Sequence, residues 1–105
     1  MDKAAAVERV KRYADAVSQV LPVKKVILYG SYAKGSAGEH SDIDVGVILD
    51  RVDEDYLTIA SRLFSLRRAI DARIEPVLIE EEDDPSGFSQ MVSKTGMVIF
   101  SSDRS

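Results

Sequence analysis

The segment 42–49, Asp-Ile-Asp-Val-Gly-Val-Ile-Leu, places the strongest constraint on the fold of this chain. Alternate residues of a β-strand share a face, so one face of this segment is continuously apolar and must pack against a core. Asp42 and Asp44 begin the other face, and Gly46 continues it without a side chain, which predicts open room beside the two carboxylates. The sequence therefore predicts a strand that is buried on one side and carries two acids at the start of its exposed side.

Apolar residues recur through the rest of the chain at intervals typical of helices or of further strands. Spacings of three and four predict two long helices, the first ended by Pro22 and the second preceded by the acids of 53–55. Short β-branched runs predict three more strands. The expected order is helix 3–21, strand 23–29, turn-rich segment 30–41, strand 42–49, helix 53–72, strand 73–79, helix 88–94 and strand 97–100.

These elements predict one domain over 1–105, of α/β (or α+β) class, with a small mixed β-sheet flanked by helices. The short link between the first two strands predicts an antiparallel pair, whereas the helix between the second and third permits a parallel pair. Pro76 lacks an N–H group, which predicts that strand 73–79 lies at an edge of the sheet or lacks one ladder hydrogen bond. The acidic run 80–84 and the following Pro85 predict a solvated break.

The composition of the 105 residues excludes several classes of site. There is no cysteine, which removes disulfides, zinc–thiolate sites, iron–sulfur clusters and thiol nucleophiles. The net charge of −4 argues against binding to duplex DNA through its phosphates. No apolar run approaches the roughly 20 residues that cross a bilayer, and residues 1–12 mix charges in a way that no signal peptide does. We therefore expect a cytoplasmic protein that is not held in a membrane.

Residues 30–44 hold the groups that indicate chemistry. Two carboxylates on one face repel each other, and a divalent cation that prefers oxygen ligands would offset the repulsion. Gly30 permits a sharp turn, Ser31 would open a helical turn whose free amides bind phosphate, and Lys34 lies one turn further on. Nucleotide phosphates bridged by Mg²⁺ need both kinds of site. The alternative is a solvent-facing strand that carries acids without a function, and a P-loop is excluded because Ser36 and Ala37 follow Gly35.

The sequence Gly30-Ser31, ten further residues and then Asp42-Ile43-Asp44 resembles the signature of the DNA polymerase β-like nucleotidyltransferase superfamily. It is most similar to the minimal nucleotidyltransferases, and also to the N-terminal part of kanamycin nucleotidyltransferase. The resemblance implies the nucleotidyltransferase fold and transfer of a nucleoside monophosphate, AMP from ATP, to an acceptor hydroxyl with release of pyrophosphate. It further implies that Asp42 and Asp44 hold two Mg²⁺ ions and that Gly30 and Ser31 contact the tail phosphates, with Ser41 and Lys34 as supporting donors.

The same family uses a third acid on a neighbouring strand as a metal ligand and general base. Glu75 lies inside the apolar run 73–79 and takes that place here, although the family more often has aspartate. The alternative for Glu75 is a solvent-facing residue of an edge strand. Asp71 is the second choice, and helical spacing makes it a surface acid.

Minimal nucleotidyltransferases are commonly encoded beside a helical HEPN-type protein, as antitoxin and toxin. The resemblance implies adenylylation of such a partner, while a homo-oligomer is the other expected assembly. A non-catalytic module that keeps the fold and binds a partner is the alternative function, and modification of a small molecule is a third.

Three further residues are weighed and left outside the predicted site. His40 is expected to be an exposed turn residue. Among the tyrosines, Tyr29 is expected in the core, and only Tyr32, in the motif loop, is a candidate to stack on a base.

Overall fold

The computed structural model describes residues 1–38, 40–84 and 86–102 and contains a four-stranded mixed sheet with the strand order β3-β2-β1-β4. Strand β1 (Lys25–Tyr29) pairs antiparallel with β2 (Ile43–Leu49) and with β4 (Met97–Ser101). Strands β2 and β3 (Ile74–Glu80) are parallel. The predicted mixed sheet, the antiparallel pair β1–β2 and the parallel pair β2–β3 are confirmed, and the pairing of β4 with β1 is a finding of the structure.

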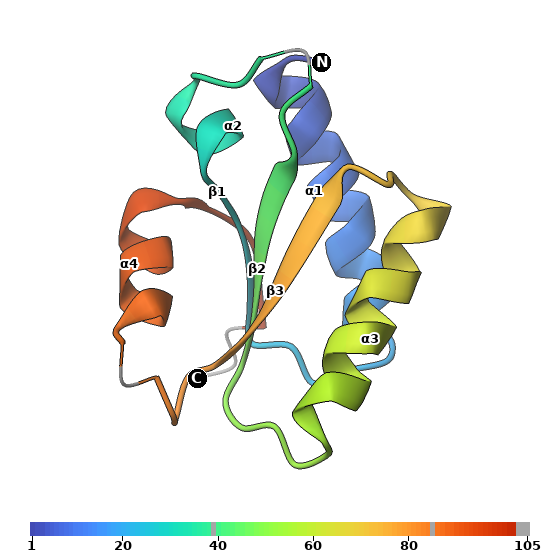
Figure 1. Ribbon diagram of the computed structural model, residues 1–105, viewed down its shortest axis with the longest axis vertical. Helices are drawn as coiled ribbons and strands as arrows, with labels where there is room; N and C mark the ends of the chain where they lie inside the picture. The colour runs from blue at the N-terminus through green and yellow to red at the C-terminus, as the bar shows by residue number, and fades with distance from the viewer. Residues whose placement is uncertain (39, 85, 103–105) are drawn as a thin grey trace.

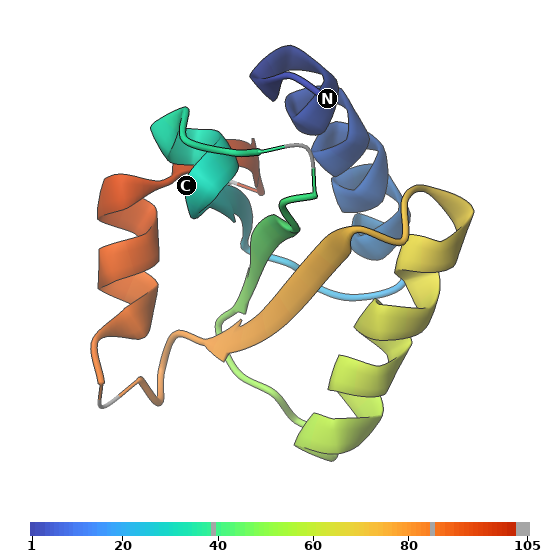
Figure 2. The same ribbon diagram turned by 45° about the horizontal axis from the view of Figure 1, so that its top comes forward.

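Helices cover both faces of the sheet, and they do so unequally (Figure 1). Helix α1 (Lys3–Ser18) and helix α3 (Tyr56–Leu66), which continues into the 3₁₀ turn η1 (Arg67–Ala69), pack on one face. Helix α4 (Phe88–Thr95) lies alone on the other face, and the single turn α2 (Ser31–Lys34) lies at the end of the sheet (Figure 2). The larger core lies beneath α1 and α3, where Ile43, Val45 and Val47 are fully buried. No helix in the described part of the chain is long and apolar enough to cross a membrane.

The ends of the two long helices differ from the prediction. Helix α1 ends at Ser18 rather than residue 21, because Gln19 already caps it and Pro22 disfavours helical backbone in the residue before it. Helix α3 begins at Tyr56, since the Asp55 side chain accepts the amide of Thr58 at 3.2 Å and so sets the first turn. The acidic run 80–84 was predicted as a solvated break, but its first residue, Glu80, is the last residue of β3. Pro85, which follows the run, lies outside the described residues.

Gly46 does not leave the open room that its missing side chain predicted. It is buried, and a Cβ atom there would lie 3.2 Å from Cδ1 of Ile79 and 3.3 Å from Cγ1 of Val92. The prediction was wrong because α4 packs over this part of the sheet, where Ile27, Ile48, Ile79 and Val92 form a second core. Only the end of this face that carries the acids stays uncovered.

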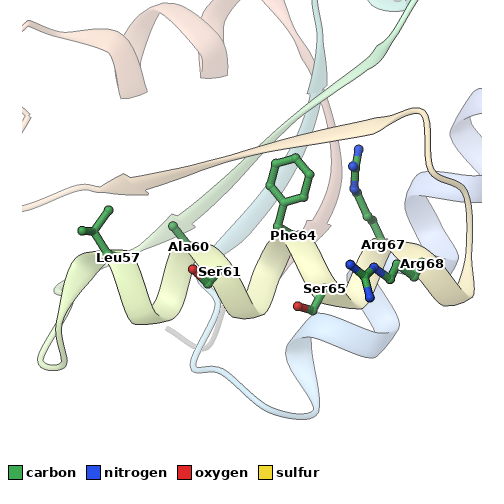
Figure 3. A pocket seen from close by; sticks show the side chains of 7 residues that line it. All are labelled: Leu57, Ala60, Ser61, Phe64, Ser65, Arg67 and Arg68. Carbon is green, nitrogen blue, oxygen red and sulfur yellow. The ribbon is translucent and has the colours of Figure 1, made fainter.

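Strand β3 lies at the edge of the sheet, as Pro76 predicted, and two of its outer carbonyl groups accept hydrogen bonds from side chains of the helical layer. The Ile74 carbonyl accepts a hydrogen bond from Nη1 of Arg67 at 3.0 Å, and the Leu78 carbonyl accepts one from the Tyr56 hydroxyl at 2.6 Å. Phe64 and Arg67 rise from the helix towards this strand (Figure 3). With two of its carbonyl groups occupied and no N–H group at Pro76, this edge is a poorer template for pairing with another strand.

Candidate active site

The end of β1 and the start of β2 bring Gly30 against Asp44. Tyr29 pairs with Asp44 across the two strands, so the chain turns away from the sheet directly beside this carboxylate. Gly30 has a φ of 75°, and a Cβ atom at this position would overlap Oδ2 of Asp44. Glycine is therefore required twice, by the left-handed backbone and by the close approach of a carboxylate.

Three predicted acids lie at this end of the sheet. Asp42 is exposed just before β2, Asp44 is partly buried within it, and Glu75 is the register partner of Asp44 on β3. Because register partners in adjacent strands share a face, Asp44 and Glu75 project on the same side. Partial burial raises the pKa of Asp44 above its usual value, and the charges of Asp42 and Glu75 raise it further. The structure thus places three carboxylates within electrostatic reach of one another.

The residues present suit Mg²⁺ by the chemistry of their donors. Carboxylate oxygens are its preferred protein ligands, and a cation would offset the repulsion that raises the pKa of Asp44. Within the described ranges, no three acidic or histidine side chains converge as a preformed metal cluster. This agrees with the way Mg²⁺ binds in nucleotide sites, where it keeps several waters and takes one or two carboxylates together with substrate phosphates.

Glu75 has a cationic neighbour that the sequence did not reveal. Nη1 of Arg67 lies 3.7 Å from Oε1 of Glu75 and donates to the carbonyls of Ala72 at 2.7 Å and Ile74 at 3.0 Å. The guanidinium carbon also lies 3.9 Å above the centre of the Phe64 ring. Arg67 is therefore fixed mainly by the backbone and the ring, and Glu75, whose side chain is 43% exposed, interacts with it weakly.

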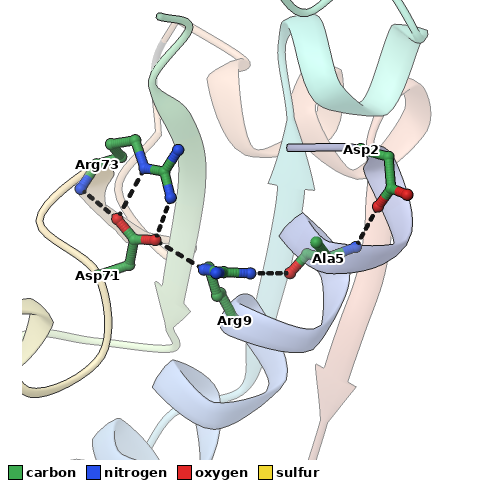
Figure 4. Close-up of polar contacts among 5 residues, drawn as sticks. All are labelled: Asp2, Ala5, Arg9, Asp71 and Arg73. Carbon is green, nitrogen blue, oxygen red and sulfur yellow. Dashed lines mark hydrogen bonds and ion pairs between the residues drawn. The ribbon is translucent and has the colours of Figure 1, made fainter. Parts of the chain in front are cut away.

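Asp71, the second choice for the third acid, is committed elsewhere (Figure 4). Its carboxylate accepts hydrogen bonds from Nε and Nη2 of Arg73 and forms an ion pair with Arg9 at 2.8 Å. The side chain is only 10% exposed, and its arginine partners, chiefly Arg73, lower its pKa to about 2. The expectation of a surface acid was wrong, because Asp71 lies in the turn that ties α1 to the start of β3.

The predicted phosphate-binding residues surround α2. Gly30 caps this turn and Ser31 begins it, next to Asp44, while Lys34 is exposed in its last position. Oγ of Ser41 accepts the amide of Gly38 at 2.8 Å, so it closes the loop and keeps its own hydroxyl hydrogen for another acceptor. His40 is exposed, as expected.

Tyr29 was expected in the core and Tyr32 at the site, and the structure shows the reverse. Tyr32 is 2% exposed and lies in the main core, so the prediction that it could stack on a base was wrong. Tyr29 is instead partly buried on the face of Asp44, where its ring meets that of Phe88 edge-to-face at 5.9 Å and 86°. Strand alternation contained the signal, since Tyr29 is the register partner of an active-face acid; nothing in the sequence indicated Phe88.

Comparison with known protein families shows which family the chain belongs to. Residues 10–105 match the family described as "Polymerase beta, Nucleotidyltransferase", which is most of the chain. The chain belongs to this nucleotidyltransferase family. The match includes every carboxylate and loop residue described above, and the enzymes of this family transfer nucleotides.

Two archaeal relatives share part of the nucleotidyltransferase sequence. One is the putative protein adenylyltransferase MJ0141 of Methanocaldococcus jannaschii, 33% identical over 82 residues that cover 71% of this chain and 80% of that protein. The other is the putative protein adenylyltransferase MJ0604 of the same organism, 54% identical over 35 residues. This second match covers 33% of the chain and 34% of the relative's length.

Solved structures of low sequence identity share the fold. A putative nucleotidyltransferase from Sulfolobus solfataricus superposes with a TM-score of 0.71 at 20% identity, covering 95% of this chain and 84% of that one. A chain from a toxin–antitoxin crystal structure with AMP-PNP gives 0.59 at 22% identity, covering 89% and 74%. A chain from a mutant of the toxin–antitoxin pair MntA-HpeT gives 0.61 at 18% identity, with the same coverage. These matches confirm the nucleotidyltransferase fold.

Proposed function

We propose that this chain transfers AMP from ATP to an acceptor hydroxyl and releases pyrophosphate. The observation that supports this most is the position of Asp44, between the backbone of Gly30 and the register partner Glu75, with Asp42 beside it. A phosphate-binding turn and a group of carboxylates thus adjoin at one end of one sheet. The names of the two archaeal relatives, which are given as protein adenylyltransferases, favour AMP as the transferred group.

Each predicted site residue has a role in this proposal. Asp42, Asp44 and Glu75 would hold Mg²⁺, two ions in all, which supplies positive charge to the triphosphate and acidifies the acceptor hydroxyl. The amides of Gly30 and Ser31 would bind the tail phosphates, with Lys34 and the Ser41 hydroxyl as further donors.

The transfer step exchanges one phosphorus–oxygen bond for another. The acceptor oxygen forms a bond to the α-phosphorus, and the bond from that phosphorus to the oxygen bridging it to the β-phosphorus breaks. Pyrophosphate leaves with the electron pair, and the hydroxyl proton passes to a carboxylate, for which Glu75 is the candidate. Its side chain is 43% exposed, so an acceptor can approach it from outside the sheet.

We propose that the acceptor belongs to a second protein, a HEPN-type toxin that the chain inactivates as its antitoxin. Two structural neighbours come from toxin–antitoxin crystals, which supports a protein partner. A homo-oligomer is the other assembly, and we expect a cytoplasmic location, where ATP is available, with no stable binding to duplex DNA. The second candidate function is a module that binds the partner without turnover, since glutamate replaces the usual third aspartate at position 75.

Transfer of label from α-labelled ATP tests the proposal. The purified chain is incubated with Mg²⁺ and lysate of its host, beside Asp44→Asn and the matched control Asp53→Asn, which removes an exposed acid paired with Arg51 far from the site. We expect label on a protein band with the wild type and with Asp53→Asn, and none with Asp44→Asn. Label that persists with Asp44→Asn would refute the assignment, and intact Mg²⁺-ATP binding without any label would favour the binding module.

A further inference from the structure

An aromatic pair continues the active face from the carboxylates towards α4. The Tyr29 ring leans along the sheet, so that its Cε1 atom lies 3.8 Å from the point where a Cβ of Gly46 would be. Its edge-to-face partner Phe88 is the first residue of α4. The ring of Tyr29 therefore lies between Asp44, its register partner, and Phe88.

Val77 completes an apolar layer with these two rings. All three side chains are partly exposed and pack on the fully buried second core. Val77 follows Glu75 by two residues on the same face of β3, a separation of roughly 6.6 Å along a strand. We define Tyr29, Val77 and Phe88 as the apolar layer. The distance from the acids to this layer is thus about the length of one sugar unit.

Open space adjoins this layer. A hollow of about 380 Å³ is lined on its apolar side by Val77, Ile79 and Phe88. Towards the end of β3 its lining is polar and includes Tyr56, Glu80, Asp83, Asp84 and Ser86. A volume of this order lies within the range of small-molecule sites, and the partly exposed ring of Phe88 borders it.

We propose that Phe88, supported by Tyr29 and Val77, is the platform on which the nucleoside of the substrate rests. The inference depends on the proposed function, because it assumes a triphosphate at Gly30 and Ser31 with its α-phosphate beside Asp44. Those residues lie at the end of the sheet, and Tyr29 and Val77 continue its face from there to Phe88, so a bound nucleotide would extend from α2 towards the start of α4. Stacking on an aromatic ring accepts any base, so the platform supplies affinity with little base selectivity.

Titration calorimetry with two ligands separates the platform from the phosphate site. Each protein is titrated with ATP and with tripolyphosphate, which has no nucleoside, both in Mg²⁺. Phe88→Leu keeps the apolar bulk and removes the ring, Phe88→Tyr keeps the ring, and Met91→Leu is the matched control at an exposed position of the same helix.

We expect Phe88→Leu to weaken ATP binding by about tenfold, the usual effect of one lost stacking contact, and to leave tripolyphosphate binding unchanged. Phe88→Tyr and Met91→Leu should bind both ligands as the wild type does. Equal losses for both ligands, or no loss of ATP affinity in Phe88→Leu, would overturn the platform and leave the proposed function standing. A wild-type chain that bound neither ligand would overturn the proposed function, and the platform with it.

Discussion

At the scale of single residues, Gly30 connects the backbone to the chemistry. Its positive φ satisfies the turn into α2, and its missing Cβ makes space for the Asp44 carboxylate. Gly35 ends the same turn with a similar φ of 78°, but a Cβ atom at that position would have no neighbour within 4 Å. The ψ angles differ, at −148° for Gly30 and 16° for Gly35, so Gly35 has left-handed helical backbone while Gly30 lies in a region that essentially only glycine occupies. Only Gly30 touches the site.

Replacing these glycines separately tests that distinction. Gly35→Ala should lower the free energy of unfolding by about 1 kcal/mol, because alanine resists a positive φ, and Gly30→Ala by about 2–3 kcal/mol, because its backbone region admits essentially only glycine. Only Gly30→Ala should also abolish Mg²⁺-dependent nucleotide binding, since it displaces Asp44. Urea unfolding and nucleotide titration measure the two effects. Equal effects of both variants on binding would contradict the role given to Gly30.

Asp71 predicts how stability depends on pH. Its pKa is lowered to about 2 in the folded chain, against about 3.9 in the unfolded chain, so it stabilises the fold above pH 4 and loses that contribution as the pH falls towards 2. We expect this to be worth about 1–2 kcal/mol, after screening around the partly exposed arginines.

Urea unfolding at pH 7 and at about pH 2 checks the contribution of Asp71. Asp71→Asn should be less stable than the wild type at pH 7 and close to it at about pH 2. Asp15→Asn, at an exposed position of α1, is the control and should follow the wild type at both values. A difference between Asp71→Asn and the wild type that stayed constant with pH would show that the ion pairs are not its cause.

At the scale of elements, the covered edge of β3 depends on Arg67. Arg67→Met keeps apolar packing on Phe64 but leaves the carbonyls of Ala72 and Ile74 without their donor. We expect the free energy of unfolding to fall by about 1–2 kcal/mol. Arg67→Lys should recover only part of it, because an ammonium group cannot replace the planar guanidinium against both backbone and ring. Unfolding curves that matched the wild type for Arg67→Met would show that solvent serves these carbonyls equally well.

The elements also show where sequence reasoning succeeds and where it stops. The strands, the pairing of the first three and the edge position of Pro76 follow from alternation, link lengths and a missing N–H, all of which are local properties. The place of β4 beside β1 does not follow from them. The side of the sheet on which α4 packs cannot be predicted from the sequence, because residues 88–95 would show the same pattern of apolar residues on either side. That choice decides that Gly46 is buried and that Phe88 joins the active face.

The same limit applies to the site. Asp42 and Asp44 were predicted together because strand parity places them on one face, whereas Glu75 was predicted only from the resemblance to nucleotidyltransferases. The register that puts Glu75 beside Asp44 is a finding of the structure. Tyr29 and Tyr32 were exchanged because the turn at Gly30 directs the chain from the sheet into α2, which turns Tyr32 into the core. The contact of Arg67 with Glu75 crosses from η1 to β3, and no spacing rule encodes it.

At the scale of the whole molecule, the helices leave uncovered the end of the sheet that carries the acids. α1 and α3 close one face and α4 closes part of the other, so the carboxylates lie where a nucleotide and an acceptor can both approach (Figure 2). Burial, together with the charges of Asp42 and Glu75, raises the pKa of Asp44, so its charged form is a cost to the fold without a cation. The wild-type chain should therefore be less stable than a variant with a neutral residue at position 44 when no ligand is bound. When Mg²⁺ and nucleotide are bound, the wild-type chain should be the more stable of the two.

Thermal unfolding of the wild type, Asp44→Asn and the control Asp53→Asn, with and without Mg²⁺ and ATP, tests this most directly. Without ligand, Asp44→Asn should melt at a higher temperature than the wild type, because it removes a repelled charge. With ligand at about 100 times its dissociation constant, the wild type and Asp53→Asn should gain roughly 10 °C or more, and Asp44→Asn should gain nothing. An Asp44→Asn chain that melted lower than the wild type, or that Mg²⁺-ATP still stabilised, would contradict the central claim that these carboxylates form a Mg²⁺-nucleotide site.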